Sequence, residues 1–154
     1  MDWIIDFLTN QFLVIGICSW AVAQVLKTII YAIINKKFDY RRLFGDGGMP
    51  SCHSATVAGL SVACAMECGP GSVEFALSAI LAIIVCHDAM GVRLETGKQA
   101  VVINEIVEAF NALALDGLPE VKLKEFVGHT PIQVIAGVLL GIINAIVMHF
   151  IWFT

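Results

Sequence analysis

The segment Gly47–Met66, GGMPSCHSATVAGLSVACAM, joins a polar turn to an apolar, helix-like stretch without a single charged residue. A proline, two serines and a histidine stand where the turn meets the helix. An ionisable group at the mouth of a membrane helix is costly and is therefore usually functional. If this apolar segment is a membrane helix, His53 is therefore a candidate active group at its start.

The composition of the whole chain favours a membrane protein. Its 154 residues are 58% hydrophobic and 14% charged, with a mean hydropathy of +0.85. Soluble domains carry about 25% charged residues. The length predicts a single domain, 1–154. The net charge of −4 argues against a nucleic-acid partner, which calls for a basic face. The N-terminal sequence has no signal-peptide pattern.

Four segments approach the roughly 20 apolar residues that a spanning helix needs. They are Phe12–Asn35, Ser51–Glu67, Val73–Met90 and Pro131–Phe153, of which the second is at the short limit. Gly137 and Gly141 form a pair of small residues typical of close helix crossings in lipid. We therefore predict an all-α integral membrane bundle of about four spanning helices.

The long polar stretch between the third and fourth segments contains an amphipathic helix. Apolar residues recur at helical spacing, and polar residues fall on the other side. We expect this helix to lie on the membrane surface or to cap the bundle. The apolar set is Val102, Ile103, Ile106, Phe110 and Leu113, and the polar set is Asn104, Glu105, Glu108 and Asn111.

The five cysteines mostly fall inside apolar segments, and their odd number argues against a disulfide framework. Cys64 and Cys68 are interpreted as small packing residues. Trp3 and Trp152, near the chain ends, are expected to act as interface anchors.

If each helix spans once, alternate helices run in opposite directions, and one membrane face collects most of the polar groups. His149 is excluded, because it follows His129 by 20 residues, roughly 30 Å of helix. We interpret it as an interfacial, aromatic-like residue. The collected groups are Lys27, Ser51, His53, His87, Asp88, Arg93 and His129.

This set of groups is suited to phosphate chemistry. Helix N-termini offer free N–H groups and a partial positive charge to an anion. Of two histidines, one can attack phosphorus while the other protonates the leaving oxygen. Lys27 and Arg93 would neutralise the non-bridging oxygens, and Ser51 and the helix N–H groups would help to hold them.

Lys27 and the blocks GGMPSCHSATVAGLS, DAMGVR, GKQAVVIN and GHTPIQVIAGVLLG resemble the divergent branch of the type 2 phosphatidic acid phosphatase superfamily. That branch is often labelled acid phosphatase/vanadium-dependent haloperoxidase-related. The resemblance covers nearly the whole chain. It implies a helical bundle that cleaves phosphomonoesters or pyrophosphates through a phosphohistidine, with no metal and no other cofactor.

The first superfamily motif is a lysine followed by an arginine, and here it matches Lys27 with Arg41 or Arg42. The second, Pro-Ser-Gly-His, matches Pro50, Ser51 and His53, with Cys52 in place of the glycine. The resemblance therefore implies that His53 is the general acid.

The third motif contains an arginine and the nucleophilic histidine, which Arg93 and His129 resemble. Here 35 residues separate the two, as in the divergent branch. The resemblance implies a carboxylate four residues after the nucleophile, but Gln133 occupies that position. A glutamine oxygen can accept an imidazole N–H but carries no charge. Asp88 could supply the charge instead, or could simply pair with Arg93.

Three functions follow from these residues. The first is an integral membrane phosphatase that hydrolyses a lipid phosphomonoester or lipid diphosphate, with Arg42 and Lys98 as weaker candidates for headgroup contacts. The second is a metal-dependent hydrolase that uses His53, His87, Asp88 and His129. The third is a catalytically weak or inactive protein that binds lipid phosphate. We expect the first, with the bilayer and its lipid phosphate as partners. The sequence names neither the lipid nor the oligomeric state, and a homo-oligomer is compatible with it.

The basic residues also predict an orientation. Basic loops stay on the cytoplasmic side of a membrane. Both basic loops here carry the candidate site, so we expect a site that opens to the cytoplasmic leaflet of the plasma (inner) membrane, with both chain ends outside. The nine basic residues are Lys27, Lys36, Lys37, Arg41, Arg42, Arg93, Lys98, Lys122 and Lys124.

Overall fold

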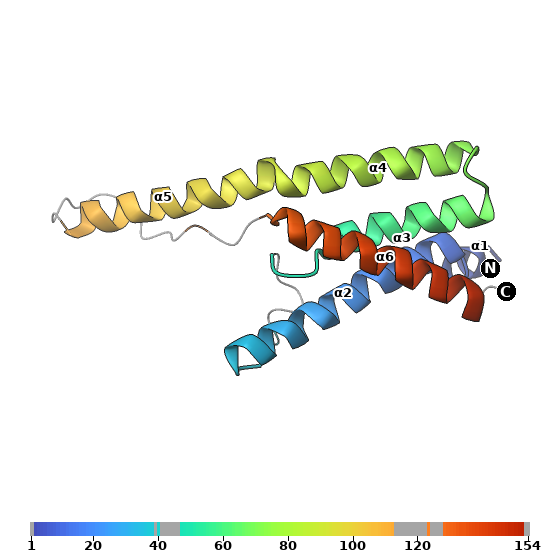
Figure 1. Ribbon diagram of the computed structural model, residues 1–154, viewed down its shortest axis with the longest axis horizontal. Coiled ribbons are helices and arrows are strands. Elements are labelled where there is room, and N and C mark those ends of the chain that lie inside the picture. The colour runs from blue at the N-terminus through green and yellow to red at the C-terminus, as the bar shows by residue number, and fades with distance from the viewer. Residues whose placement is uncertain (1, 39, 41–46, 113–122, 124–127, 153–154) are drawn as a thin grey trace.

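The computed structural model describes residues 2–38, 40, 47–112, 123 and 128–152, and its secondary structure within these ranges is helical. The predicted all-α fold is therefore confirmed. Figure 1 shows the helices in chain order. They are α1 (Asp2–Leu8), α2 (Gln11–Asn35), α3 (Cys52–Glu67), α4 (Val73–Met90), α5 (Val92–Ala112) and α6 (Pro131–Trp152).

Three helical stretches are long and apolar enough to cross a membrane: Gln11–Asn35, Val73–Asn111 and Pro131–Ile151. The second predicted segment, Ser51–Glu67, forms α3, which has only 16 residues and packs against α2, α4 and α6. The chain is thus a membrane bundle, as predicted, and α3 is its short inner helix.

The helix starts follow ordinary capping chemistry. Asn10 accepts hydrogen bonds from the backbone N–H groups of Phe12 and Leu13, at 3.0 and 3.1 Å. Ser72 accepts one from Phe75 at 3.1 Å. Such side chains satisfy N–H groups that have no partner within the helix. Each cap therefore fixes the residue at which its helix begins.

The predicted close crossing lies between α6 and α3. A Cβ atom on Gly137 would collide with the carbonyl oxygen of Ser51, and one on Gly141 with that of Ala55. Further along, Asn144 donates a 2.9 Å hydrogen bond to the Ser19 hydroxyl of α2. Backbone contact at the two glycines thus sets the position of α6 on α3.

The amphipathic helix does not cap the bundle, which was one of its two predicted positions (Figure 1). α5 follows α4 after Gly91 and extends past the end of the bundle, which it does not cap (Figure 1). Ile106 and Phe110 are exposed, whereas Asn104 is buried. The Asn104 side chain exchanges two hydrogen bonds with the Leu123 backbone, at 3.0 and 2.9 Å, which explains its burial. Leu113 lies outside the described residues.

The described ends of the chain lie together at the end of the bundle opposite the starts of α3 and α6 (Figure 1). At that far end, His149 Nδ1 lies 2.7 Å from Glu67 Oε1. The interpretation of His149 as a merely interfacial residue was therefore incomplete, because its ring joins α6 to the end of α3. Trp3 is exposed, and the Trp152 side chain lies outside the described residues.

Candidate active site

Backbone contacts join several chain segments at the site end of the bundle. The Ser51 N–H donates to the Gln133 carbonyl at 3.0 Å, and the His129 N–H donates to the Ala89 carbonyl at 3.0 Å. Gly128, at φ 88°, lies so close to the first turn of α5 that a Cβ would meet the backbone of Arg93 and Leu94. The residue before His129 thus touches the Arg93 backbone, although 35 residues separate Arg93 from His129.

His53 and His129 form the centre of this end. Their ring centroids lie 6.3 Å apart, with the ring planes at 80°. His129 is 3% exposed, and His53 is half-buried in the first turn of α3. Proton transfer needs heavy atoms about 2.6–3.2 Å apart. Two imidazoles at the observed separation can therefore both approach one phosphoryl group placed between them.

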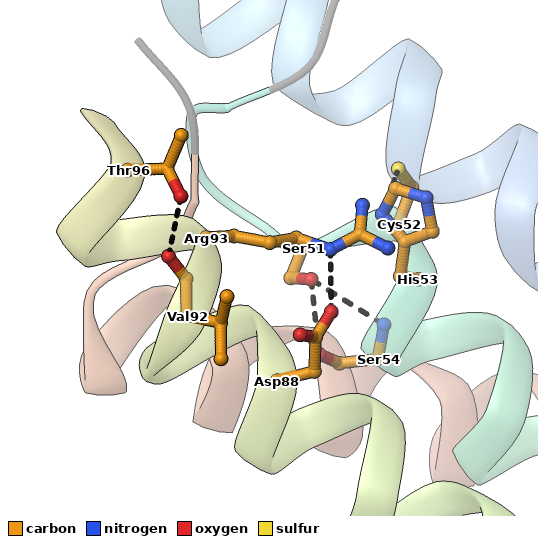
Figure 2. Close-up of polar contacts among 8 residues, drawn as sticks. All are labelled: Ser51, Cys52, His53, Ser54, Asp88, Val92, Arg93 and Thr96. Carbon is orange, nitrogen blue, oxygen red and sulfur yellow. Dashed lines mark hydrogen bonds and ion pairs between the residues drawn. The ribbon is translucent and has the colours of Figure 1, made fainter. Parts of the chain in front are cut away.

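Ser51 caps the helix that carries His53. Its fully buried hydroxyl accepts hydrogen bonds from the Ser54 N–H at 3.3 Å and the Ser54 hydroxyl at 2.9 Å (Figure 2). The N–H groups of this turn point out of the helix start, which is a favourable place for an anion. The first role of Ser51 is therefore to fix the turn that positions His53.

A chain of contacts links Lys27 to His53 through Cys52. Lys27 Nζ lies 3.6 Å from Cys52 Sγ, which lies 3.8 Å from His53 Nδ1. Lys27 is 3% exposed, so it lies within the bundle and does not snorkel to its surface. This position of Cys52 between Lys27 and His53 was not predicted; the available signal in the sequence was that Cys52 replaces the glycine of the motif.

Arg93 is held by Asp88 at the junction of α4 and α5. Arg93 Nε lies 2.6 Å from Asp88 Oδ2, and Figure 2 shows the arginine extending from α5 towards the side that carries His53. The side chains are 51% and 37% exposed. The structure thus shows the Arg93 pairing that was one of two alternatives for Asp88.

The other predicted phosphate contacts lie further out or are not described. Lys98 is exposed and pairs with Glu95 at 2.6 Å on the surface of α5. Arg41 and Arg42 lie outside the described residues. Their predicted roles, like those of the other site residues, stay predictions.

The Gln133 side chain has a hydrogen-bond partner directly before its own helix, α6. Its side-chain oxygen accepts a 3.1 Å hydrogen bond from the Thr130 N–H. Thr130 and Gln133 have the spacing of a capping box, in which the third helical residue reaches back to the residue before the helix. The Thr-x-x-Gln pattern is the sequence signal for this contact, which was not predicted.

The four residues of the metal-dependent alternative do not form a cluster. All four belong to the described part of the chain, in which no group of three or more His, Cys, Asp or Glu side chains could hold a metal ion. His87, in addition, is exposed on the last turn of α4. This geometry does not favour a metal site built from His53, His87, Asp88 and His129.

Comparison with known proteins agrees with this arrangement. The sequence profile of the Divergent PAP2 family matches residues 8–144. An uncharacterized membrane protein of Bacillus subtilis (strain 168), YuiD, is 41% identical to this chain over an alignment 154 residues long. The alignment covers 94% of this chain and 98% of that protein. No solved structure matches. The family match spans His53 and His129 and ends within α6, and the chain therefore belongs to the Divergent PAP2 family of membrane proteins.

Proposed function

We propose that this protein is a metal-independent membrane phosphatase that hydrolyses a lipid phosphate through a phosphohistidine. The observation that carries the proposal is the pair of imidazoles, 6.3 Å apart between centroids, at the capped start of α3 and the start of α6. Membership in a PAP2-related family supports it.

In the first step, a ring nitrogen of His129 attacks phosphorus, and a P–N bond forms as the P–O bond to the lipid alcohol breaks. His53 gives its proton to the departing alkoxide. In the second step, His53 takes a proton from water, whose oxygen attacks phosphorus and releases inorganic phosphate and free His129. Lys27, Arg93 and the N–H groups at the start of α3 stabilise the charge on the phosphoryl oxygens.

The proposal includes an orientation. At the site end, Lys36 and Lys37 follow α2, and Arg93 stands in the first turn of α5. Both described chain ends lie at the other end of the bundle (Figure 1). By the positive-inside rule, the site then faces the cytoplasm and the chain ends face outward. The lipid substrate is accordingly drawn from the cytoplasmic leaflet of the plasma membrane.

The histidine pair provides the test of catalysis. We expect His129→Ala to abolish phosphate release and any acid-labile phosphoenzyme, because the nucleophile is lost. We expect His53→Ala to slow release by at least about 10²-fold, the lower end for a positioned general acid. Phosphate release from a panel of lipid phosphates in EDTA, with and without vanadate, measures both.

His87→Ala is the matched control, because His87 is exposed and lies outside the imidazole pair. It should retain the wild-type rate, whereas a metal site that used His87 would lose activity. Full activity in His129→Ala would exclude the phosphohistidine.

A second function, binding of a lipid phosphate without turnover, is favoured by one observation. The position where the resemblance implies a carboxylate holds Gln133, whose oxygen accepts the Thr130 N–H. Binding of the lipid phosphate together with absence of vanadate-sensitive release would establish this function instead.

A further inference from the structure

The Cys52 side chain combines apolar packing with two polar contacts. Cys52 is the first residue of α3, is 2% exposed, and packs in a buried cluster with Ala23 of α2 and Ala55 of α3. Its sulfur nevertheless lies 3.6 Å from Lys27 Nζ and 3.8 Å from His53 Nδ1, the second contact being drawn in Figure 2. Cys52 therefore touches two residues that the proposed phosphatase mechanism uses.

The chemistry of the two nitrogen atoms decides in which direction these hydrogen bonds run. An ammonium group has three N–H donors and no acceptor, so Lys27 donates to the Cys52 sulfur and keeps donors for a phosphoryl oxygen. A protonated imidazole also has donors only, so His53 in its charged form donates its Nδ1–H to the same sulfur. A thiol S–H is a weak donor. The sulfur is therefore better suited to accept the Nδ1–H of the neutral His53 ring than to donate to Nδ1.

The two proposed roles of His53 need a proton that stays on Nδ1. In the first step His53 gives a proton to the leaving oxygen, and in the second step it takes one from water. If Nε2 performs both transfers, the ring between the two steps must carry its single proton on Nδ1, because a protonated Nε2 has no lone pair for the proton of water. An acceptor next to Nδ1 keeps His53 in the form that can act in both steps.

The place of the sulfur is fixed by the start of α3. Ser51 caps this turn through the Ser54 N–H, and the Thr56 hydroxyl donates to the Cys52 carbonyl at 2.8 Å. Consecutive side chains of a helix do not normally face each other. The contact between Cys52 and His53 therefore selects one orientation of the His53 ring, with Nδ1 turned to the sulfur.

We propose that Cys52 is a positioning residue, whose sulfur accepts the Nδ1–H of His53 so that Nε2 exchanges the catalytic proton in both steps. This inference rests on the proposed function. In the first step the Nε2 proton moves to the departing alkoxide, and Nδ1–H remains on the sulfur. In the second step Nε2 takes a proton from water while the water oxygen bonds to phosphorus and the bond from phosphorus to His129 breaks.

The test uses the full-length protein in lipid nanodiscs and two measurements. The first is solid-state NMR with ¹³C,¹⁵N-labelled histidine, which shows which ring nitrogen carries the proton. The His53 signals are those missing from His53→Ala. The second is phosphate release from a panel of lipid phosphates. Cys52→Ala removes the acceptor and Cys52→Ser keeps one. The matched control is Cys64→Ala, which changes another buried cysteine of α3 away from the imidazole pair.

We expect the neutral His53 ring to carry its proton mainly on Nδ1 in the wild-type protein, in Cys52→Ser and in Cys64→Ala. In Cys52→Ala the Nδ1–H form loses its acceptor, and a larger share of the rings should carry the proton on Nε2. Phosphate release should fall by about tenfold in Cys52→Ala, as for a lost hydrogen bond to a charged group. Cys52→Ser and Cys64→Ala should release phosphate at rates close to that of the wild-type protein.

Three results would overturn the inference. They are a wild-type His53 ring that carries its proton on Nε2, the same proton distribution in Cys52→Ala as in the wild-type protein, and an unchanged rate in Cys52→Ala. Should Cys52→Ala fail to fold, Cys52→Val, which is also without an acceptor, takes its place. Should both fail, the position of the proton in the wild-type protein decides.

The failure of this inference and the failure of the proposed function can be told apart. If the wild-type protein and Cys52→Ala release phosphate equally fast, the phosphatase stands and the role of Cys52 is wrong. If the wild-type protein releases no phosphate, the phosphatase is wrong. The NMR measurement then still tests whether the Cys52 sulfur holds the proton on His53 Nδ1, because it does not depend on turnover.

Discussion

At the scale of single residues, Gln133 has two candidate roles: it could orient the nucleophile, or it could cap α6. The resemblance implies a carboxylate at this position that orients the nucleophile, whereas the structure shows a helix cap, with the Thr130 N–H donating to the Gln133 side chain at 3.1 Å. A cap affects the free energy of unfolding, while an orienting group affects the pKa of His129 and therefore the pH–rate profile. The two roles can be separated by substitution.

We expect Gln133→Leu to lower the stability by about 0.5–2 kcal/mol, because the Thr130 N–H loses its acceptor. Gln133→Glu should keep wild-type stability, since it retains an acceptor and places a negative charge at a helix N-terminus. Thermal unfolding in detergent measures both. The midpoints of the pH–rate profile should not move in either variant.

Thr130→Ala is the control for this pair, because it keeps the backbone N–H and removes only the hydroxyl and γ-methyl groups of the threonine side chain. A shift of the pH–rate midpoint in Gln133→Glu, upward by raising the pKa of His129, would instead assign Gln133 to the nucleophile.

Contacts between residues of different helices, such as those of Cys52, could not be predicted from the sequence. The motif identified Ser51 and His53, because their order matches a known pattern. It could not show that the Cys52 thiol lies between Lys27 and His53, since this depends on how α2 and α3 pack. The contact between Glu67 and His149 was not predicted either, because the two residues are 82 positions apart in the sequence and meet only through the packing of α3 and α6.

At the scale of helices, the crossing of α6 over α3 determines how the two histidines are placed, because His53 is in the first turn of α3 and His129 directly precedes α6. Gly141 faces the Ala55 carbonyl and the Gly59 N–H so closely that any side chain must push the helices apart. Overpacking of this kind costs about 1–3 kcal/mol. We expect Gly141→Ala to lower the unfolding temperature in detergent and to lower phosphate release, because α6 carries His129 at its start.

Gly71→Ala is the matched control, because a Cβ at that turn position would meet nothing within 4 Å. It should unfold at the wild-type temperature. If Gly141→Ala and Gly71→Ala were equally stable, the crossing would have to be looser than the structure shows.

The helix boundaries were largely predictable, because turn and cap residues mark them. Ser72 and Gly91 bracket α4, and Pro131 begins α6, where its missing N–H costs nothing. The path of α5 was not predictable. Its apolar spacing indicated a surface or capping position, but the burial of Asn104 depends on Leu123, which is 19 residues away.

At the scale of the whole molecule, the native cysteines can report the orientation. Cys68 is exposed between α3 and α4, at the end of the bundle opposite the site, whereas Cys52 and Cys64 are buried. If the site faces the cytoplasm, a membrane-impermeant maleimide should label Cys68 in intact cells. Cys68→Ser is the control. Labelling only after the membrane is permeabilised would place this end inside and the site outside.

The pH dependence of that labelling is a further expectation. Desolvation and the nearby charge of Glu74 raise the pKa of the Cys68 thiol. The thiolate is the reactive form. A raised pKa leaves less thiolate at neutral pH, so the labelling rate should climb as the pH rises above neutral. It should stay slower than that of an unhindered model thiol at the same pH.

The backbone hydrogen bonds at the site end have a consequence for biosynthesis. Lys27, His53, Ala89 and His129 come from four successive parts of the chain, and the Ser51–Gln133 bond can form only when α6 lies against α3. A nascent chain that has inserted α2, α3 and α4 already contains Lys27 and the proposed general acid His53, but not the proposed nucleophile His129. The proposed phosphate release therefore begins only after α6 has inserted. Chains whose synthesis stops before α6 do not hydrolyse membrane lipids by this mechanism.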